Sequence, residues 1–170
     1  MNIQKIGHSC LLIEEHGKRL LIDPWKYSFA PIGKANPEDL GSIDVILITH
    51  EHQDHFSIGA IKRLSHGGSI PIFTNASSKE LLQREGIHAE TMQEGEERTL
   101  GPFQIQAIRA PHETLPRPVP LNLGFIINEK LLHPGDSLTY TLTKNVSIVA
   151  LPVAAPWLTA QWAFETALNL

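Results

Sequence analysis

The stretch Val45-Ile46-Leu47-Ile48-Thr49-His50-Glu51-His52-Gln53-Asp54-His55 joins an apolar run directly to a group of ionisable side chains. The first five residues are mostly apolar and β-branched, which is typical of a strand buried on both faces within a layered sheet. The next six contain three histidines and an aspartate. The sequence therefore predicts a buried strand that ends at a polar site.

Four side chains in this stretch are common metal ligands: His50, His52, Asp54 and His55. Imidazole nitrogens and carboxylate oxygens together suit zinc, or iron and manganese. A loop leaving a strand can aim alternate residues to one side, so His50 and His52 can share one ion while Asp54 and His55 face another. The alternative is a solvated turn that happens to be rich in histidine, but it does not explain why four potential ligands follow an apolar strand.

Patterns before and after this stretch predict further strands and helices. The apolar runs at residues 10–13 and 20–22 flank a polar turn, as in a β-hairpin. Asn36 can cap a short helical turn that Pro37 opens. Apolar spacing at residues 57–65 predicts a helix.

The rest of the chain continues this alternation. Ser77 and Glu80 form a capping-box pattern for a helix that should stop at Gly86. The other expected elements are a strand at 71–74, several strands within 89–127, a buried strand at 147–151 and a helix capped by Thr159. This mixture favours sheets packed together and covered by helices, an α/β sandwich.

The composition is that of an ordinary globular chain. A length of 170 residues suits one hydrophobic core, so a single domain at residues 1–170 is expected. Apolar residues make up 42% of the chain and charged residues 19%, and no run approaches the roughly 18 apolar residues of a membrane span. The first eight residues lack the pattern of a secretory signal. We therefore expect a soluble, cytoplasmic protein with no membrane partner.

Charge and cysteine content narrow the classes of partner. The net charge is −4 and no dense Lys/Arg cluster is present, so no broad electrostatic grip on nucleic acid is expected. Small or uncharged substrates fit more easily. The lone Cys10 lies in an apolar run and is expected to be a buried core residue.

The motif His50-x-His52-x-Asp54-His55 resembles the His-x-His-x-Asp-His signature of the metallo-β-lactamase superfamily. The segments Ile6-Gly7-His8-Ser9-Cys10 and Leu21-Ile22-Asp23-Pro24 look like the branch that contains L-ascorbate-6-phosphate lactonase and many uncharacterised metal-dependent hydrolases. This resemblance implies an αββα four-layer sandwich with a dinuclear metal site at one edge of the sheets.

The same resemblance implies two more ligands, His112 in Ala110-Pro111-His112 and a bridging Asp136 in Gly135-Asp136. Taken alone, the first could be an ordinary loop histidine and the second a simple turn. In the implied arrangement the first ion has three histidine ligands, the second has two ligands from the first motif, and Asp136 spans both. Asp54 is also the candidate catalytic residue, which would orient an attacking hydroxide and relay its proton.

The remaining histidines and Asp23 receive less definite roles. His8 is expected either to line the pocket and orient substrate or to serve packing. Asp23 is expected either to support a ligand histidine or to form a turn. His133 could support the site next to Asp136, and three histidines are assigned to the surface: His16, His66 and His88.

The sequence differs from the family pattern toward its C-terminal end. The family supplies one more histidine after the Asp136 region, and none follows His133 in this chain. A shortened chain that lacks its C-terminal strand and natural divergence are both open. We expect the second ion to complete its shell with water and to bind more weakly than the first. An uncovered sheet edge and an apolar face on the last helix would favour homo-oligomers.

These observations predict a metal-dependent hydrolase that uses a metal-activated hydroxide on a small-molecule lactone, ester or phosphoester. The expected cofactor is Zn²⁺, as one or two ions, with Mn²⁺ or Fe²⁺ as alternatives. One alternative function is a phosphodiesterase or nuclease of the same superfamily, against which the acidic balance counts. Another is a metal-binding protein without catalysis.

Overall fold

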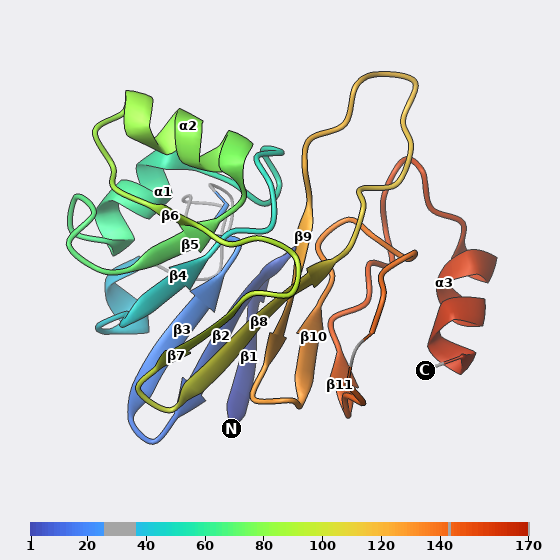
Figure 1. The fold of residues 1–170 in the computed structure, drawn as a ribbon, viewed down its shortest axis with the longest axis horizontal. Coiled ribbons are helices and arrows are strands. Elements are labelled where there is room, and N and C mark those ends of the chain that lie inside the picture. The colour runs from blue at the N-terminus through green and yellow to red at the C-terminus, as the bar shows by residue number, and fades with distance from the viewer. Residues whose placement is uncertain (26–36, 143, 170) are drawn as a thin grey trace.

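Two sheets pack against each other in the computed structural model, which describes residues 1–25, 37–142 and 144–169 (Figure 1). The first sheet has the strand order β1-β2-β3-β4-β5-β6. Its strands are β1 (Asn2–Gly7), β2 (Cys10–Glu15), β3 (Lys18–Ile22), β4 (Val45–Leu47), β5 (Ile72–Thr74) and β6 (Glu90–Thr91). The pairings from β1 to β3 are antiparallel and those from β3 to β6 are parallel. The carboxyl ends of β3, β4 and β5 therefore lie at one edge.

The second sheet has the order β11-β10-β9-β8-β7. Its strands are β7 (Glu97–Leu100), β8 (Phe103–Arg109), β9 (Leu123–Ile127), β10 (Leu131–His133) and β11 (Ile148–Val149). The pairings from β7 to β10 are antiparallel, and β11 pairs with β10 in parallel. Strands β7, β8 and β9 confirm the prediction of several strands within residues 89–127.

The alternation of side chains along the first sheet explains the layers. In β4, Val45 and Leu47 face a core between the two sheets that includes Phe103 and Phe125. Ile46 packs on the opposite face, in a core shared with the helices. The strand is thus buried on both faces, as its apolar run predicts.

Two α-helices cover the outer face of the first sheet: α1 (Ile58–Leu64) and α2 (Ala76–Arg84). Ser57 caps α1 by accepting a hydrogen bond from the Ala60 N–H. The expected cap of α2 is wrong, because Asn75 accepts from the Ser78 N–H and begins the helix. The Ser77 hydroxyl instead lies 2.9 Å from both Glu51 Oε2 and Asn75 Oδ1 and donates its one proton to the charged Glu51 carboxylate, so a residue distant in sequence competes with the local capping box.

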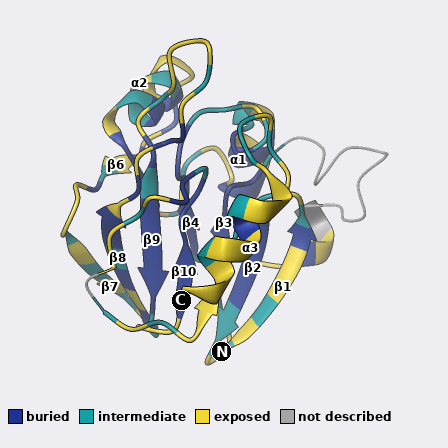
Figure 2. Ribbon diagram, turned by 90° about the vertical axis from the view of Figure 1, so that its right-hand side faces the viewer, coloured by how far each residue is buried: buried dark blue, intermediate teal, exposed yellow. Residues whose placement is uncertain are grey.

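Helix α3 (Ala160–Leu168) stands beside β11, on the side of the molecule away from α1 and α2 (Figure 1). Thr159 caps it as predicted, by accepting a hydrogen bond from the Trp162 N–H. The helix is largely exposed (Figure 2), with Phe164 and Leu168 at 64% and 70% exposure and Ala163 buried. The apolar face predicted for this helix therefore meets solvent over much of its length.

Three other expectations meet different outcomes. The buried strand predicted at 147–151 is only the two-residue β11, and its Ile148 is 44% exposed, because β11 is an edge strand paired with β10 alone. Pro37 opens the short 3-10 helix η2 (Pro37–Leu40), while Asn36 lies outside the described residues. Cys10 is fully buried, which confirms its core assignment.

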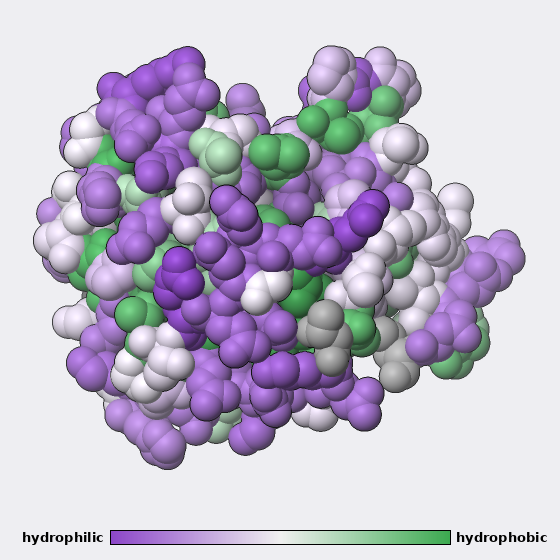
Figure 3. Space-filling model, in the orientation of Figure 1, coloured by the Kyte–Doolittle hydropathy of each residue, from purple (hydrophilic) through white to green (hydrophobic). Residues whose placement is uncertain are grey.

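One face of the molecule is mostly polar. Hydrophilic side chains predominate on the face drawn in Figure 3, and apolar ones are scattered among them. Within the described residues, no helix combines the length and the apolar character that crossing a membrane requires.

Candidate metal centre

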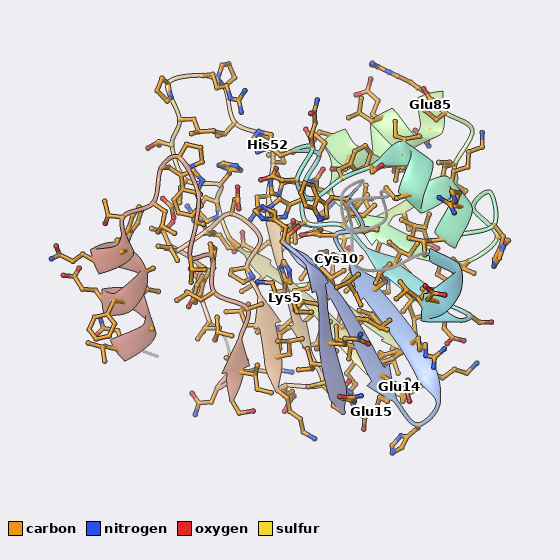
Figure 4. All side chains as sticks on the ribbon, turned by 180° about the vertical axis from the view of Figure 1, so that it is seen from behind. Lys5, Cys10, Glu14, Glu15, His52 and Glu85 are labelled. Atoms are coloured by element: carbon orange, nitrogen blue, oxygen red, sulfur yellow. The ribbon has the colours of Figure 1, made fainter. Side chains whose placement is uncertain are left out.

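The histidines and carboxylates of the candidate site lie on loops that leave neighbouring strands at one edge of the two sheets. Residues 50–55 follow β4, His112 follows β8, and Asp136 follows β10. Figure 4 shows His52 on this loop edge, with Lys5 on β1 and Cys10 on β2 lying below it. The fold thus gathers side chains that are far apart in the sequence.

One cluster brings together His50, His52, His112 and Asp136, with one donor atom from each within 4.8 Å of all the others. His112 Nε2 lies 3.0 Å from His52 Nδ1 and 3.4 Å from Asp136 Oδ2. His50 Nε2 lies 3.9 Å from the same carboxylate oxygen. Donors around a tetrahedral ion at about 2.1 Å are about 3.4 Å apart, so these separations suit one shared ion.

His50 has a buried lone pair aimed into this cluster. The Thr49 hydroxyl gives its one proton to Asp23 Oδ2, at 2.8 Å, and therefore accepts from His50 Nδ1, at 3.0 Å. His50 Nε2 is then unprotonated, and it is buried without a hydrogen-bond partner. Because unpaired buried polar atoms are costly, this nitrogen fits a metal ligand better than a structural histidine.

A second cluster contains His8, Asp54 and His55, again with one donor atom from each within 4.8 Å of the others. His8 Nε2 lies 3.2 Å from Asp54 Oδ2. Asp136 lies between the two clusters, because its Oδ1 is 3.2 Å from His55 Nε2 while its Oδ2 faces the first cluster. This carboxylate therefore faces both clusters of potential ligands.

Asp23 orients His55 by binding Nδ1, the ring nitrogen that faces away from Asp136. It is fully buried, and its carboxylate accepts hydrogen bonds from His55 Nδ1 at 2.7 Å and from the Thr49 N–H and hydroxyl at 2.8 Å each. With a proton fixed on Nδ1 by Asp23, the opposite nitrogen, Nε2, faces Asp136 and can offer a lone pair to an ion once it has lost its own proton. Of the two roles left open for Asp23 by the sequence, this contact fits the support of a histidine that is a candidate ligand.

The carboxylates of Asp23 and Asp136 stabilise positive charge at the site. Burial alone lowers the pKa of His55, but Asp23 and Asp136 outweigh it and raise the pKa to about 10. Burial also raises the pKa of Asp136, yet hydrogen bonds from His112 and His55 bring it well below its usual range. Without an ion at neutral pH, His55 is therefore an imidazolium held between two carboxylates.

We expect metal binding at neutral pH to displace this proton from His55. The affinity for the ion that His55 contacts should rise about tenfold per pH unit below pH 10, since one proton is exchanged for each ion. Calorimetric titration in two buffers of different ionisation enthalpy would count the protons released. Binding without proton release, at an affinity independent of pH, would contradict the protonated state assigned to His55.

Asn122 and Gly135 shape the loops that carry two of the candidate ligands, and no local sequence pattern indicates the role of Asn122. Asn122 donates to the Ala110 and Pro134 carbonyls, at 2.6 and 2.9 Å, and so joins the His112 loop to the Asp136 loop. Gly135 has φ +60, and a Cβ there would clash with the side chains of Asn122 and Thr49. Only glycine therefore fits beside Asp136.

The other histidines fall into two groups. His133 is buried and donates from Nε2 to the Ser9 carbonyl at 2.8 Å, which ties the Asp136 region to the turn after β1. The three histidines assigned to the surface are all exposed: His16, His66 and His88.

A pocket of about 230 Å³ opens beside the centre. His8, His55 and Asp136 form its polar end, and residues 150–154 contribute a mainly apolar wall. Lys5 also lines it and brings a positive charge. The pocket can hold a small molecule in contact with the second cluster.

Two curated relatives align with most of the chain. Protein Rv0786c from Mycobacterium tuberculosis is 28% identical over 165 residues, which covers 93% of this chain and 74% of the relative. UPF0173 metal-dependent hydrolase MJ1163 from Methanocaldococcus jannaschii is 29% identical over 141 residues, which covers 77% of this chain and 58% of the relative.

Solved structures share the fold. A protein from Parabacteroides distasonis superposes with a TM-score of 0.78 at 23% identity, over 97% of this chain and 76% of that one. Igni18, a metallo hydrolase from Ignicoccus hospitalis, superposes with a TM-score of 0.62 at 27% identity, over 79% and 60% of the two chains. The family model of the beta-lactamase superfamily domain matches residues 2–170. The chain belongs to the metallo-β-lactamase superfamily.

Proposed function

We propose that this protein is a metal-dependent hydrolase of small molecules. The observation that carries the proposal is the buried, unpartnered Nε2 of His50, which points at two further imidazoles and the Asp136 carboxylate. The relative MJ1163 is itself named a metal-dependent hydrolase, which supports the same reaction class.

In this proposal His50, His52 and His112 hold the first ion, Asp54 and His55 hold the second, and Asp136 contacts both. The donor set of imidazoles and carboxylates suits Zn²⁺, with Mn²⁺ or Fe²⁺ as alternatives. When bound, such a pair supplies Lewis acidity and a water whose pKa is lowered toward neutrality.

The protein's own groups then divide the remaining tasks. Asp54 is the candidate catalytic residue, because its carboxylate lies at the second cluster and is 45% exposed toward solvent. It can orient the attacking water and accept its proton. Lys5 lines the pocket and can hold an anionic group of the substrate away from the reacting bond.

A lactone, ester or phosphoester fits this arrangement, since hydrolysis of each develops negative charge on oxygen. The pocket of about 230 Å³ suits a compact substrate rather than a polymer. Among the described residues that line the pocket, Lys5 is the only lysine or arginine. The pocket therefore offers little positive charge to the phosphates of a nucleic acid.

We expect chelation to abolish hydrolysis and Zn²⁺ or Mn²⁺ to restore it. The test screens lactones, esters and phosphoesters with metal-free and reloaded protein, with metal content measured in parallel. Asp54→Ala should fold normally by circular dichroism but lose at least about 10²-fold in rate after reloading, as expected for a lost general base.

Two results would contradict the proposal in different ways. Hydrolysis that persists in protein shown to be free of metal would exclude a metal-dependent mechanism. Stoichiometric metal uptake without turnover of any compound in the panel would favour a metal-binding protein without catalysis.

A further inference from the structure

We propose that His8 is a ligand of the second metal ion, together with Asp54 and His55, an inference that rests on the proposed function. Its Nε2 lies 3.2 Å from Asp54 Oδ2, and the donor atoms of all three residues lie within 4.8 Å of one another. Two donors of one tetrahedral ion are separated by about 3.4 Å. The His8 nitrogen is therefore at ligand distance from its neighbour.

The backbone holds His8 in an uncommon conformation at the site. Its φ is +43, in the left-handed region that residues with a Cβ seldom occupy. Such conformations persist where surrounding contacts enforce them, and they often coincide with functional positions. His8 lies in the tight turn between Gly7 and Cys10, which face each other in the β1–β2 pairing.

This turn is fastened to the metal centre on two sides. The Ser9 hydroxyl donates to the Asp54 carbonyl at 2.6 Å, and the Ser9 carbonyl accepts from His133 Nε2 at 2.8 Å. One contact fixes the turn to the His-x-His-x-Asp-His loop, and the other fixes it to the strand that leads to Asp136. His8 is thereby held against both halves of the site.

The ring of His8 is also oriented. It packs against Trp25, with ring centroids 5.1 Å apart, and meets His55 edge-on at 6.1 Å. These contacts leave Nε2 directed at Asp54. A side chain placed only by chance at the surface would not have its ring fixed from two directions.

His8 changes the ligand count of the second ion. Without it, the described donors are Asp54, His55 and the shared Asp136, which is the basis for expecting a weak second site completed by water. With His8, two imidazoles and two carboxylates surround that ion, which is a full set for four-coordinate zinc. The N-terminal turn thus adds a second nitrogen donor to those of the second cluster.

The variant His8→Asn separates ligation from simple hydrogen bonding to Asp54. Asparagine tolerates the left-handed backbone and keeps an N–H donor, but its amide is a poor zinc ligand. The matched control is His16→Asn, because His16 also has a left-handed φ of +47 in a turn, and its side chain is 82% exposed. Each protein is titrated with Co²⁺ while visible absorption is recorded, and zinc content is measured after dialysis.

We expect two ions per chain in the wild type and in His16→Asn. In His8→Asn the second ion should bind at least about 100-fold more weakly, since changes to supporting residues alone cost 10- to 100-fold, while the first ion is retained. Two ions held by His8→Asn with unchanged affinities would overturn the assignment. A wild type that holds one ion, unaffected by the variant, would also overturn it but leave a single-metal hydrolase intact. A wild type that holds no ion would remove the proposed function as well.

A second measurement avoids mutation. Diethyl pyrocarbonate modifies accessible histidines, and the His8 side chain is 40% exposed. Mass spectrometry of wild-type protein should show His8 modified with zero or one equivalent of Zn²⁺ and protected at two, while His16 stays reactive throughout. Equal modification of His8 at every metal level would contradict ligation.

Discussion

Replacing Asp136 with alanine is expected to remove metal from both clusters and to reduce hydrolysis to the background rate. The carboxylate faces His50 and His112 through one oxygen and His55 through the other. Its loss therefore removes a donor from each ion and the negative charge that draws them together. We expect less than one ion per chain and a rate at least about 10³-fold lower, because metal activation contributes several kcal/mol and each 1.4 kcal/mol is tenfold.

Glu129→Ala provides the matched control. This exposed carboxylate lies just before β10, at the end of the strand opposite Asp136, and pairs with Lys144. Elemental analysis and turnover should match the wild type in the control and collapse in Asp136→Ala. Normal metal content and turnover in Asp136→Ala would mean that this carboxylate serves neither ion.

Replacing Asp23 with alanine is expected to destabilise the metal-free protein by about 3–5 kcal/mol, the usual effect of removing one partner from a buried ionic pair. Three hydrogen-bond donors on Thr49 and His55 would lose their acceptor inside the protein. Urea unfolding in the presence of a chelator measures this loss without a contribution from bound metal.

Glu80→Ala is the control for Asp23, because it removes a carboxylate from an exposed pair with Arg84 on α2. Its effect should stay within about 0.5 kcal/mol. Asp23→Asn adds a second comparison: the side chain keeps its size, but its amide N–H₂ opposes the proton on His55 Nδ1. An unfolding free energy in Asp23→Ala equal to that of the control would show that the buried network contributes little.

Local patterns predicted the elements that carry the first motif. The run ending at Thr49 combines hydrophobicity, β-branching and an abrupt change to ionisable residues, and these signals agree. The cap of α2 was mispredicted for the opposite reason. Ser77 has the right local spacing, but Glu51 lies 26 residues earlier in the sequence and accepts its hydroxyl proton. Such competition arises only once the fold is formed.

The site residues likewise divide into those that local sequence patterns indicate and those that only the folded structure brings together. Histidines spaced along one loop could be recognised from sequence, and the resemblance to a family suggested His112 and Asp136. The contact between His8 and Asp54 joins residues 46 positions apart, and no periodic pattern in the sequence indicates it. The role of Asn122 is similarly hidden, because it depends on two carbonyls from different loops.

The sequence distances across the centre bear on how the chain folds. The contacts that assemble it span 46 residues between His8 and Asp54, 60 between His52 and His112, and 124 between Ser9 and His133. Closing loops of this length costs chain entropy. Burial of the nearby hydrophobic cores must offset this cost before the site can assemble. An ion has no compact group of ligands from both sheets to bind in the unfolded chain. In the unfolded chain it can meet only the local donors at residues 50–55, and the complete donor set forms once the two sheets have come together.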